Sequence, residues 1–362
     1  MNSFGQKLRF STFGESHGKA IGTVLDGVPA GLDIDEKFIQ SELDRRKPGK
    51  SEFETARKEA DKVEILSGVF EGKSTGTPIA MIIYNTNQKS KDYSNIKDIF
   101  RPGHADFTYF NKYGIRDYRG GGRSSARETA ARVAAGAVAK LMLKQLNIEV
   151  FSGICEVAGI KADEFDYSYA KDSIIYALDK NKEQKQKDAI LEAKNNHDSV
   201  GGVSRVVIKG TPCGLGEPLY YKLDAILADA MMGINAVKAV EIGDGILAAS
   251  SLGSKNNDQI RANGFESNHA GGILGGISNS QDIVLNVYFK PTPSIFQSQH
   301  TVTTTNEEVD FELKGRHDPC VAIRGTVVCE AMAALVVADM LLLNMGSTME
   351  GVSKYYNTIL IS

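Results

Sequence analysis

Two long segments rich in alanine and aliphatic residues constrain the fold most. They cover residues 126–146 and 327–343, and both are expected to be helices that pack closely against a neighbour. Each follows a helix, strands and a loop rich in glycine and arginine, and Glu128 and Glu330 lie near the two helix starts. We interpret this shared order as an internal duplication. Chance similarity is the alternative, because no short repeat of fixed length is present.

The duplication predicts an α+β fold with the long helices inside and antiparallel sheets outside. Strands are expected at residues 8–13, 21–25, 63–70, 79–84, 203–209, 240–242, 246–248 and 283–289, and further helices at 35–46 and 223–238. We expect a single domain over residues 1–362, with repeat halves at about 1–150 and 200–345. The lysine-rich segment 161–198 is interpreted as a charged surface excursion.

Composition excludes several classes of protein. The chain has 362 residues and a formal charge of −3, which is ordinary for a globular protein. Its four cysteines lie far apart, which argues against disulfide scaffolds and zinc ribbons and favours a reducing compartment. The apolar run at 331–343 is interrupted by Asp339 and is shorter than the roughly 20 residues that span a bilayer. We therefore expect no membrane insertion and, without a metal-ligand spacing, no metal site.

An arginine-rich segment at residues 101–132 stands out in this acidic chain. Arg123 and Arg127 flank the predicted start of the first long helix, where Ser125 and Glu128 fit a capping box. The helix dipole disfavours cations there, so an anion bound between the two arginines would explain them. A solvated basic loop is the alternative.

Three other groups could carry chemistry. His17 and His104 lie in short turn-rich motifs after probable strands, although a lone histidine is more often structural. Asp339 is the one charge in its apolar run, and it is a proton carrier if it faces inward and a solubilising group if it faces outward. Lys290, Thr292 and Ser294 follow a strand and could bind phosphate, or could simply end the strand.

Several motifs in order resemble the chorismate synthase family. They are Gly14-Glu15-Ser16-His17-Gly18, Gly122-Arg123-Ser124-Ser125-Ala126-Arg127-Glu128-Thr129 and Arg316-His317-Asp318-Pro319-Cys320, with further blocks around His104, Asn235, His269 and Lys290. The resemblance spans about residues 5–343 and leaves out only the charged excursion and the tail.

The resemblance implies a carbon–oxygen lyase. The implied reaction is the 1,4-anti elimination of phosphate from 5-enolpyruvylshikimate 3-phosphate to give chorismate, the last step of the shikimate pathway, and it requires reduced FMN without net redox change. It also implies a four-layer β-α-α-β sandwich assembled as a homotetramer. The cysteine usage predicts a cytoplasmic location. We expect an external flavin reductase, with NADPH involved only indirectly, and no nucleic-acid or membrane partner.

The resemblance also assigns roles to residues. His104 would be the general acid toward the departing phosphate, His17 would protonate or hydrogen-bond the reduced flavin, and Asp339 would help to move the substrate proton. Arg46, Arg101, Arg127 and Arg324 would clamp the substrate anions. The positions matching FMN contacts are Arg123, Ser124, Ser125, Asn235, Ala236, Gly275, Lys290, Pro291, Thr292, Pro293, Ser294 and Arg316. Arg46 also matches a pyridine-nucleotide contact, although Glu52 stands where relatives often carry a basic residue.

Two other classes of function compete with this interpretation. Aromatic residues among the arginines of 101–132 could make a nucleic-acid-binding module, which the sequence pI of about 6.1 disfavours. A flavin-independent phosphate-ester enzyme could use the same anion-binding groups.

Overall fold

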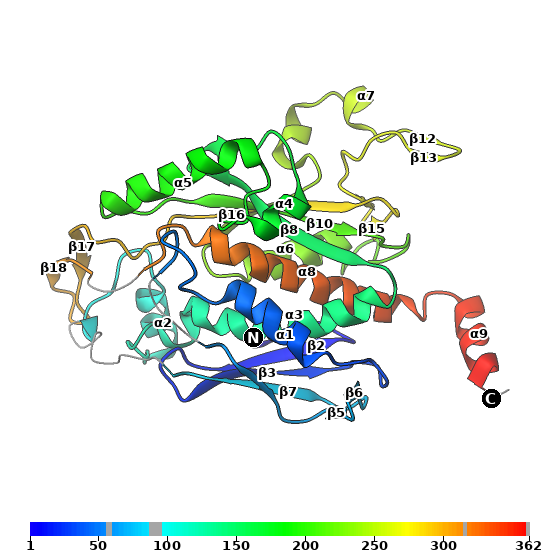
Figure 1. Cartoon of the computed structure of the whole chain (residues 1–362), viewed down its shortest axis with the longest axis horizontal. Helices are drawn as coiled ribbons and strands as arrows, with labels where there is room; N and C mark the ends of the chain where they lie inside the picture. Colours follow the sequence, from blue (N-terminus) through cyan, green and yellow to red (C-terminus); the bar gives the residue numbers. More distant parts are fainter. Residues whose placement is uncertain (56–59, 87–95, 314–316, 360–362) are drawn as a thin grey trace.

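The computed structural model describes residues 1–55, 60–86, 96–313 and 317–359. Two five-stranded antiparallel sheets, with helices packed between them, make up the body (Figure 1). The protein is therefore a mixed α/β structure.

The first sheet comes from the N-terminal part of the chain. Its strand order is β1 (Ser3–Phe4), β2 (Arg9–Gly14), β3 (Ala20–Asp26), β7 (Ile79–Tyr84) and β4 (Val63–Ile65). Ile79, Met81 and Ile83 on β7 are buried, whereas the residues between them are less so, as expected of a strand with one face on the core.

The second sheet is built from residues 149–289. Its order is β11 (Val237–Ile242), β16 (Ile283–Phe289), β10 (Gly202–Lys209), β8 (Glu149–Val157) and β9 (Ile160–Lys161). The apolar residues of β16 alternate in the same way, with Ile283, Leu285, Val287 and Phe289 buried. The predicted strands at 203–209 and 283–289 are confirmed, whereas the long strand β8 was not predicted.

Helices α1 (Glu36–Arg46), α3 (Thr129–Lys144) and α8 (Ala322–Asn344) lie between the sheets. Helix α3 packs on β3 and β7, α8 packs on β8 and β10, and the two helices pack along each other. A Cβ added at Gly136 of α3 would lie 2.5 Å from the Cβ of Ala331 on α8. The expected close approach of the two alanine-rich helices is confirmed.

Helix α8 is longer than the apolar run suggested by the sequence. Of the described helices, α8 alone has the length and composition of a membrane span. However, 83% of its most apolar 18-residue stretch is buried inside the protein. Because every residue from Gly325 to Met340 is buried, α8 is a core helix enclosed on all sides.

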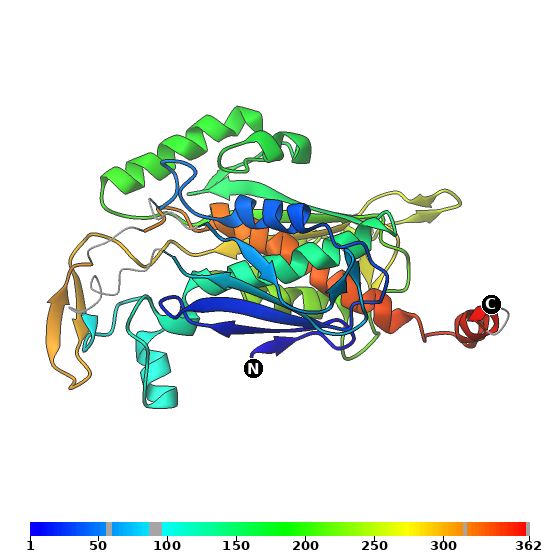
Figure 2. The same ribbon diagram turned by 60° about the horizontal axis from the view of Figure 1, so that its bottom comes forward.

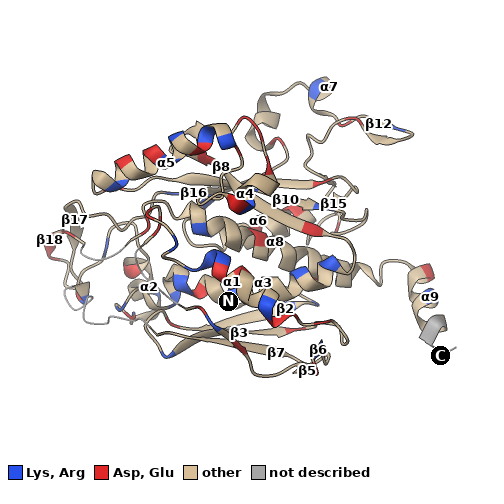
Figure 3. Cartoon of the chain, viewed as in Figure 1, with Lys and Arg blue, Asp and Glu red and all other residues tan. Residues whose placement is uncertain are grey.

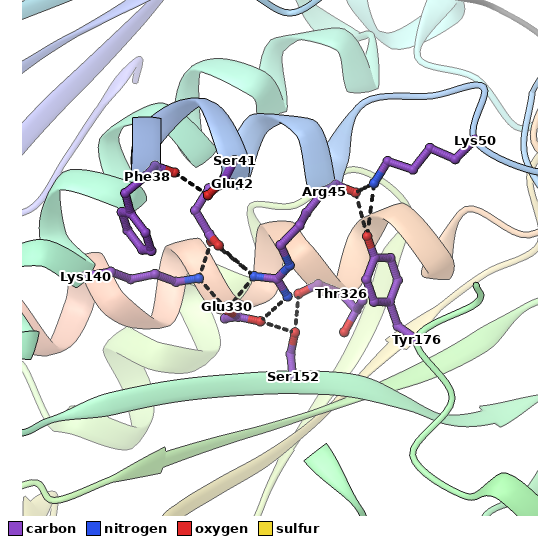
Figure 4. Close-up of polar contacts among 10 residues, drawn as sticks. All are labelled: Phe38, Ser41, Glu42, Arg45, Lys50, Lys140, Ser152, Tyr176, Thr326 and Glu330. Atoms are coloured by element: carbon purple, nitrogen blue, oxygen red, sulfur yellow. Dashed lines mark hydrogen bonds and ion pairs between the residues drawn. The ribbon is translucent and has the colours of Figure 1, made fainter. Parts of the chain in front are cut away.

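A buried ionic cluster joins three helices and the second sheet (Figure 4). Arg45 of α1 donates to both carboxylate oxygens of Glu330 on α8 at 2.9 Å, and it also contacts Glu42. Lys140 of α3 pairs with Glu42 and Glu330, and Ser152 of β8 donates to Glu330 at 2.8 Å. Burial would raise the pKa of Glu330, but Lys140 and Arg45 outweigh it and hold the pKa far below its usual value. The cluster therefore fixes α1 against the core.

Several predicted boundaries were wrong. Residues 101–123, expected to be a loop, contain α2 (Asp106–Tyr113). The predicted helix at 223–238 ends with α6 (Leu223–Met232), and the predicted strand at 246–248 lies in the 3₁₀-helix η4 (Gly245–Ser250). The predicted strand at 63–70 is split between β4 and β5 (Val69–Phe70), which pairs with β6 (Lys73–Ser74).

The remaining elements lie at the periphery. The predicted excursion contains α4 (Tyr167–Asp172) and α5 (Lys180–Asn195), and both signs of charge alternate along α5 (Figure 3). Figure 2 shows the segment with β12 (Ile260–Arg261) and β13 (Gly264–Phe265), and helix α9 (Met349–Ile359), extending away from the body. The other short elements are α7 (Gly253–Asn256), β14 (Ile273–Leu274), β15 (Ile277–Ser278), β17 (Gln299–Val302) and β18 (Glu308–Phe311).

Candidate active site

A cavity of about 860 Å³ is lined by residues from both halves of the chain. Among the described residues, the lining extends in sequence from Met1 to Met332. It contains seven arginines or lysines and three acidic residues. This volume is in the range of sites for substantial ligands, and the excess of cations favours an anionic one.

One wall is built on the glycine-rich turn before the first long helix. Gly121 has φ of +82°, and the 3₁₀-helix η2 (Gly122–Ser124) follows it. The Arg123 guanidinium donates to Gly14 O at 3.2 Å and to Thr12 Oγ1 at 2.7 Å, which fixes it against β2. A Cβ at Gly120 would lie 2.3 Å from the His17 ring, so only glycine fits between that ring and the cavity.

The opposite wall joins three loops. The Lys290 amide donates to Ala236 O at 2.9 Å, and its Nζ donates to Gly103 O at 2.8 Å. His104 Nδ1 lies 2.9 Å from Pro102 O, and Nε2 lies 2.8 Å from Ser294 Oγ. Because a carbonyl oxygen only accepts, the neutral ring donates from Nδ1 and accepts the Ser294 hydroxyl at Nε2.

Two histidines of this wall, His104 and His317, are half-buried in a positive environment. Burial, together with the charges of Arg101 and Lys290, lowers the pKa of His104 to about 4. Burial and the neighbouring His104 lower the pKa of His317 to about 4 as well. Both rings are therefore neutral at pH 7, and an anion entering the cavity would favour their protonation.

Replacing His104 by asparagine should reduce the loss in free energy of unfolding that the protein shows at acid pH. The unfolded imidazole binds a proton below about pH 6.5, but the folded one does so only near pH 4, so the native protein loses stability as pH falls through this window. The variant should therefore lose about 2 kcal/mol less free energy of unfolding between pH 7 and pH 5 than the native protein. Urea denaturation at the two pH values measures this difference. The exposed His300, changed to asparagine, is the control, and equal losses in all three proteins would contradict the prediction.

Several polar atoms of the cavity residues are buried without a hydrogen-bond partner among the described residues. They include Arg46 Nε, Arg127 Nη2, Asn235 Oδ1, Thr292 Oγ1 and Arg324 Nε. Buried polar groups in folded proteins are nearly always bonded, so these atoms indicate a site completed by a ligand or by water.

Comparison with known proteins agrees with this geometry. The family model described as chorismate synthase matches residues 8–342. The chain belongs to the chorismate synthase family. It is 83% identical over 356 residues to the chorismate synthase of Sulfurimonas denitrificans, covering 98% of this chain and 99% of that one. The chorismate synthase of Sulfurovum sp. is 72% identical over 98% of this chain and its own full length. A crystal structure of chorismate synthase is 34% identical with a TM-score of 0.76, covering 98% of both chains.

Most site residues predicted from the chorismate synthase resemblance lie in the cavity lining. They are Arg46, Arg101, His104, Arg123, Ser124, Ser125, Arg127, Asn235, Ala236, Lys290, Thr292, Pro293, Ser294 and Arg324. His17 is buried directly behind Gly120 and Ser16, which do line the cavity. Pro291 lies in the same loop as its lining neighbours but is not part of the lining itself.

Two further positions were predicted for this chorismate synthase family member, Gly275 and Arg316. Gly275 follows β14 near β15, at the other end of the molecule from α2 in Figure 1, and is outside the lining. Arg316 lies outside the described residues. Within the described ranges, no group of three or more His, Cys, Asp or Glu is arranged to hold a metal ion.

Asp339 faces inward but not toward the cavity. Its carboxylate accepts backbone N–H groups of Gln6 at 2.9 Å, Lys7 at 2.7 Å and Leu8 at 2.9 Å. The residue is 2% exposed and is not among those lining the cavity. The Asp339 carboxylate therefore anchors the N-terminal segment, and its predicted role in proton transfer stays a prediction.

Changing Asp339 to asparagine should lower the free energy of unfolding by about 2 kcal/mol, because the amide keeps one acceptor oxygen but loses the charge that strengthens three hydrogen bonds. Urea denaturation measures the loss, with Asp188→Asn on the exposed face of α5 as the control. The kcat of the folded variant should stay within a few-fold of the native value. A kcat reduced more than 100-fold would instead place Asp339 in the mechanism.

Residues in or beside the cavity that were not predicted as site residues include His317, Asp318, Asp61 and Asn85. Asp318 lines the cavity, pairs with Arg324, and accepts the Thr55 amide at 3.0 Å. Asp61 is buried between Arg46 and Arg127, and Asn85 Oδ1 accepts Arg127 Nε at 3.0 Å. Asp318 lay within a quoted family motif, but isolated polar residues such as Asp61 and Asn85 carry no local sequence signal.

Proposed function

We propose that this chain catalyses the conversion of 5-enolpyruvylshikimate 3-phosphate to chorismate and phosphate, a 1,4-anti elimination that ends the shikimate pathway. The supporting observation is the cavity with its excess of cationic side chains and its unpaired buried donors. The substrate carries a phosphate and two carboxylates, which such donors bind well. Membership of the chorismate synthase family points to the same lyase reaction.

The cavity also fits the proposed cofactor, reduced FMN. The glycine turn lets a planar ring and a phosphate approach the backbone, and Asn235, Thr292 and Lys290 present polar atoms around it. The proposed FMN-binding residues are Arg123, Ser124, Ser125, Asn235, Ala236, Lys290, Thr292, Pro293 and Ser294. When bound, the reduced flavin supplies electron density transiently, without net oxidation. The contacts of Pro291, Gly275 and Arg316 stay predictions.

The arginines are proposed to hold the substrate anions. Arg46, Arg127 and Arg324 have buried N–H groups with no hydrogen-bond partner in the described part of the chain, which suits them to bind oxygen atoms. Arg101 is already bound to Asp106, with Nε–Oδ2 at 2.7 Å and Nη2–Oδ1 at 2.9 Å. Because this pair fixes the orientation of the guanidinium, the proposed role of Arg101 is to hold its positive charge in place beside a substrate anion.

Proton transfer is assigned to the histidines. His104 is neutral in the protein alone and can take up a proton once an anion offsets the nearby positive charges. Ser294 and the Pro102 carbonyl hold its ring in one orientation. The division of roles, with His104 toward the phosphate and His17 toward the flavin, stays a prediction.

The decisive experiment is an oxygen-free assay with purified protein, substrate and FMN. Chorismate absorbance should appear with chemically reduced FMN and not with oxidised FMN or without flavin. Phosphate release without flavin would instead support a phosphate-ester enzyme, and a salt-sensitive gel shift at micromolar protein would revive the nucleic-acid-binding alternative. Either result without chorismate formation would overturn the proposal.

We also propose the finer architecture implied by the family. The two five-stranded sheets and the two long alanine-rich helices packed between them support a four-layer β-α-α-β sandwich with an internal duplication in a single domain. A homotetramer is supported by large apolar residues that are exposed in the segment from η4 to β12. They include Ile246, Leu247, Leu252 and Ile260. Light scattering should give four times the chain mass, and a monomer would contradict it.

We also propose that the protein acts in the cytoplasm. Four free cysteines are consistent with a reducing cytoplasm. We expect an external flavin reductase that uses NADPH. Glu52 is exposed and lies outside the cavity lining, so a direct pyridine-nucleotide contact there has no support beyond Arg46.

A further inference from the structure

Asp61 is a buried carboxylate enclosed by two cavity arginines. The residue is 1% exposed, and its Oδ2 accepts Arg46 Nη2 at 3.0 Å while its Oδ1 accepts Arg127 Nη1. Burial alone would raise the pKa of Asp61, but Arg46 and Arg127 outweigh it and hold the pKa below its usual value. The carboxylate is therefore ionised at neutral pH and bridges the two guanidiniums.

The bridge leaves each arginine with a donor that is not used. Arg46 also donates to Ala126 O at 3.2 Å and Thr129 Oγ1 at 3.0 Å, but its Nε is buried without a hydrogen-bond partner among the described residues. Arg127 donates from Nε to Asn85, yet its Nη2 is likewise unpaired within the described ranges. Both residues line the cavity, whereas Asp61 does not. The carboxylate thus binds one side of each guanidinium and leaves other donors for a ligand.

Charge gives Asp61 a second effect. Two guanidiniums and one carboxylate carry a net charge of one positive unit, and Arg324 adds further repulsion, since it and Arg127 both lower the pKa of Arg46. Without the carboxylate, neighbouring guanidiniums would repel one another in a buried site. Asp61 therefore determines both the separation of the arginines and the positive charge left for an anion.

We propose that Asp61 is a positioning residue that holds Arg46 and Arg127 side by side and limits the positive charge with which they bind an anionic group of the substrate. This inference rests on the proposed function for the identity of the substrate. The residue touches no ligand itself and acts through the two arginines.

The backbone of Asp61 allows a clean test. Its φ is +47°, in the left-handed region that aspartate and asparagine tolerate better than most residues. Asp61→Asn therefore keeps shape and backbone preference while it removes the charge. Asp61→Gly also suits this φ and serves as a second variant. Glu183→Gln is the matched control, because Glu183 is a buried, ion-paired carboxylate outside the cavity lining.

Inorganic phosphate is the first probe, measured by isothermal titration at several salt concentrations. Asp61→Asn should bind phosphate roughly 3–10-fold more tightly than the native protein, with a steeper salt dependence, because one negative charge is gone. In the flavin-dependent assay the same variant should show kcat lowered roughly 10–100-fold, because the arginines are no longer held in place. Tighter binding with slower turnover is a combination that general structural damage does not produce. Glu183→Gln should change neither quantity.

The outcomes separate this inference from the proposed function. Phosphate binding and kcat both unchanged in Asp61→Asn, or both weakened together, would overturn the positioning role. If both Asp61 variants fail to fold, Asp61 is required for folding, and the inference is also overturned. If the native protein makes no chorismate but phosphate binding still tightens in the variant, the proposed function fails while the charge-limiting role at this cavity holds.

Discussion

Replacing His104 by alanine is expected to lower kcat by roughly 10²–10⁴-fold in an oxygen-free assay with reduced FMN. The ring lies in the cavity wall with Nε2 at 2.8 Å from Ser294 Oγ, and Pro102 fixes its tautomer. Of the described side chains of that wall, His104 and His317 are the imidazoles, and each can take up a proton once a bound anion offsets the surrounding positive charge. The loss should therefore appear in kcat more than in KM.

Two control variants make the His104 result specific. Ser294→Ala removes the hydroxyl bonded to Nε2 but keeps the imidazole, so we expect a smaller loss, of about tenfold. His300→Ala removes an exposed histidine of the β17–β18 hairpin and should leave kcat unchanged. Near-native kcat in His104→Ala would remove His104 from the mechanism.

Changing Glu330 to alanine is expected to lower the free energy of unfolding by about 3–5 kcal/mol, because it leaves Arg45 and Lys140 without their central carboxylate in a buried cluster. The urea midpoint should fall with little change in slope. Glu192→Ala on the exposed part of α5 is the matched control and should change stability by less than about 0.5 kcal/mol. A loss below about 1 kcal/mol for Glu330→Ala would show that the cluster contributes little.

Elements with a strong local pattern were predictable. Helix α1 was expected at residues 35–46 because of its acidic start and the Pro48-Gly49 stop, and the structure shows that Asp35 accepts the Lys37 and Phe38 amides. The predicted Ser125 cap is also present, since Ser125 Oγ accepts the Arg127 amide. However, Glu128 lies 2.8 Å from Arg132 and not at the Ser125 amide, so the reciprocal half of the capping box is absent. Helix α3 begins only at Thr129, after a 3₁₀ turn.

Elements whose boundaries depend on contacts that form only in the folded chain were not predictable. Helix α2 has no side-chain cap, and its first residue, Asp106, is bound by Arg101 and Arg116. The predicted helix through Lys238 stops at Met232, and Ala236 beyond it adopts φ of +70°. Asp339 was expected to be a proton carrier if it faced inward. Its burial matched that alternative, but its three amide partners lie more than 330 residues away in sequence.

Arg45 and Arg46 are consecutive residues of α1, yet one enters the ionic cluster of the core and the other lines the cavity. An α-helix turns about 100° per residue, so the register of this helix decides which guanidinium meets which environment. One residue inserted between Asp35 and Arg45 would rotate both arginines away from their partners, even though every side chain was kept. The number of residues in α1 is consequently under as strict a constraint as their identity, and redesign of this protein has to leave that length unchanged.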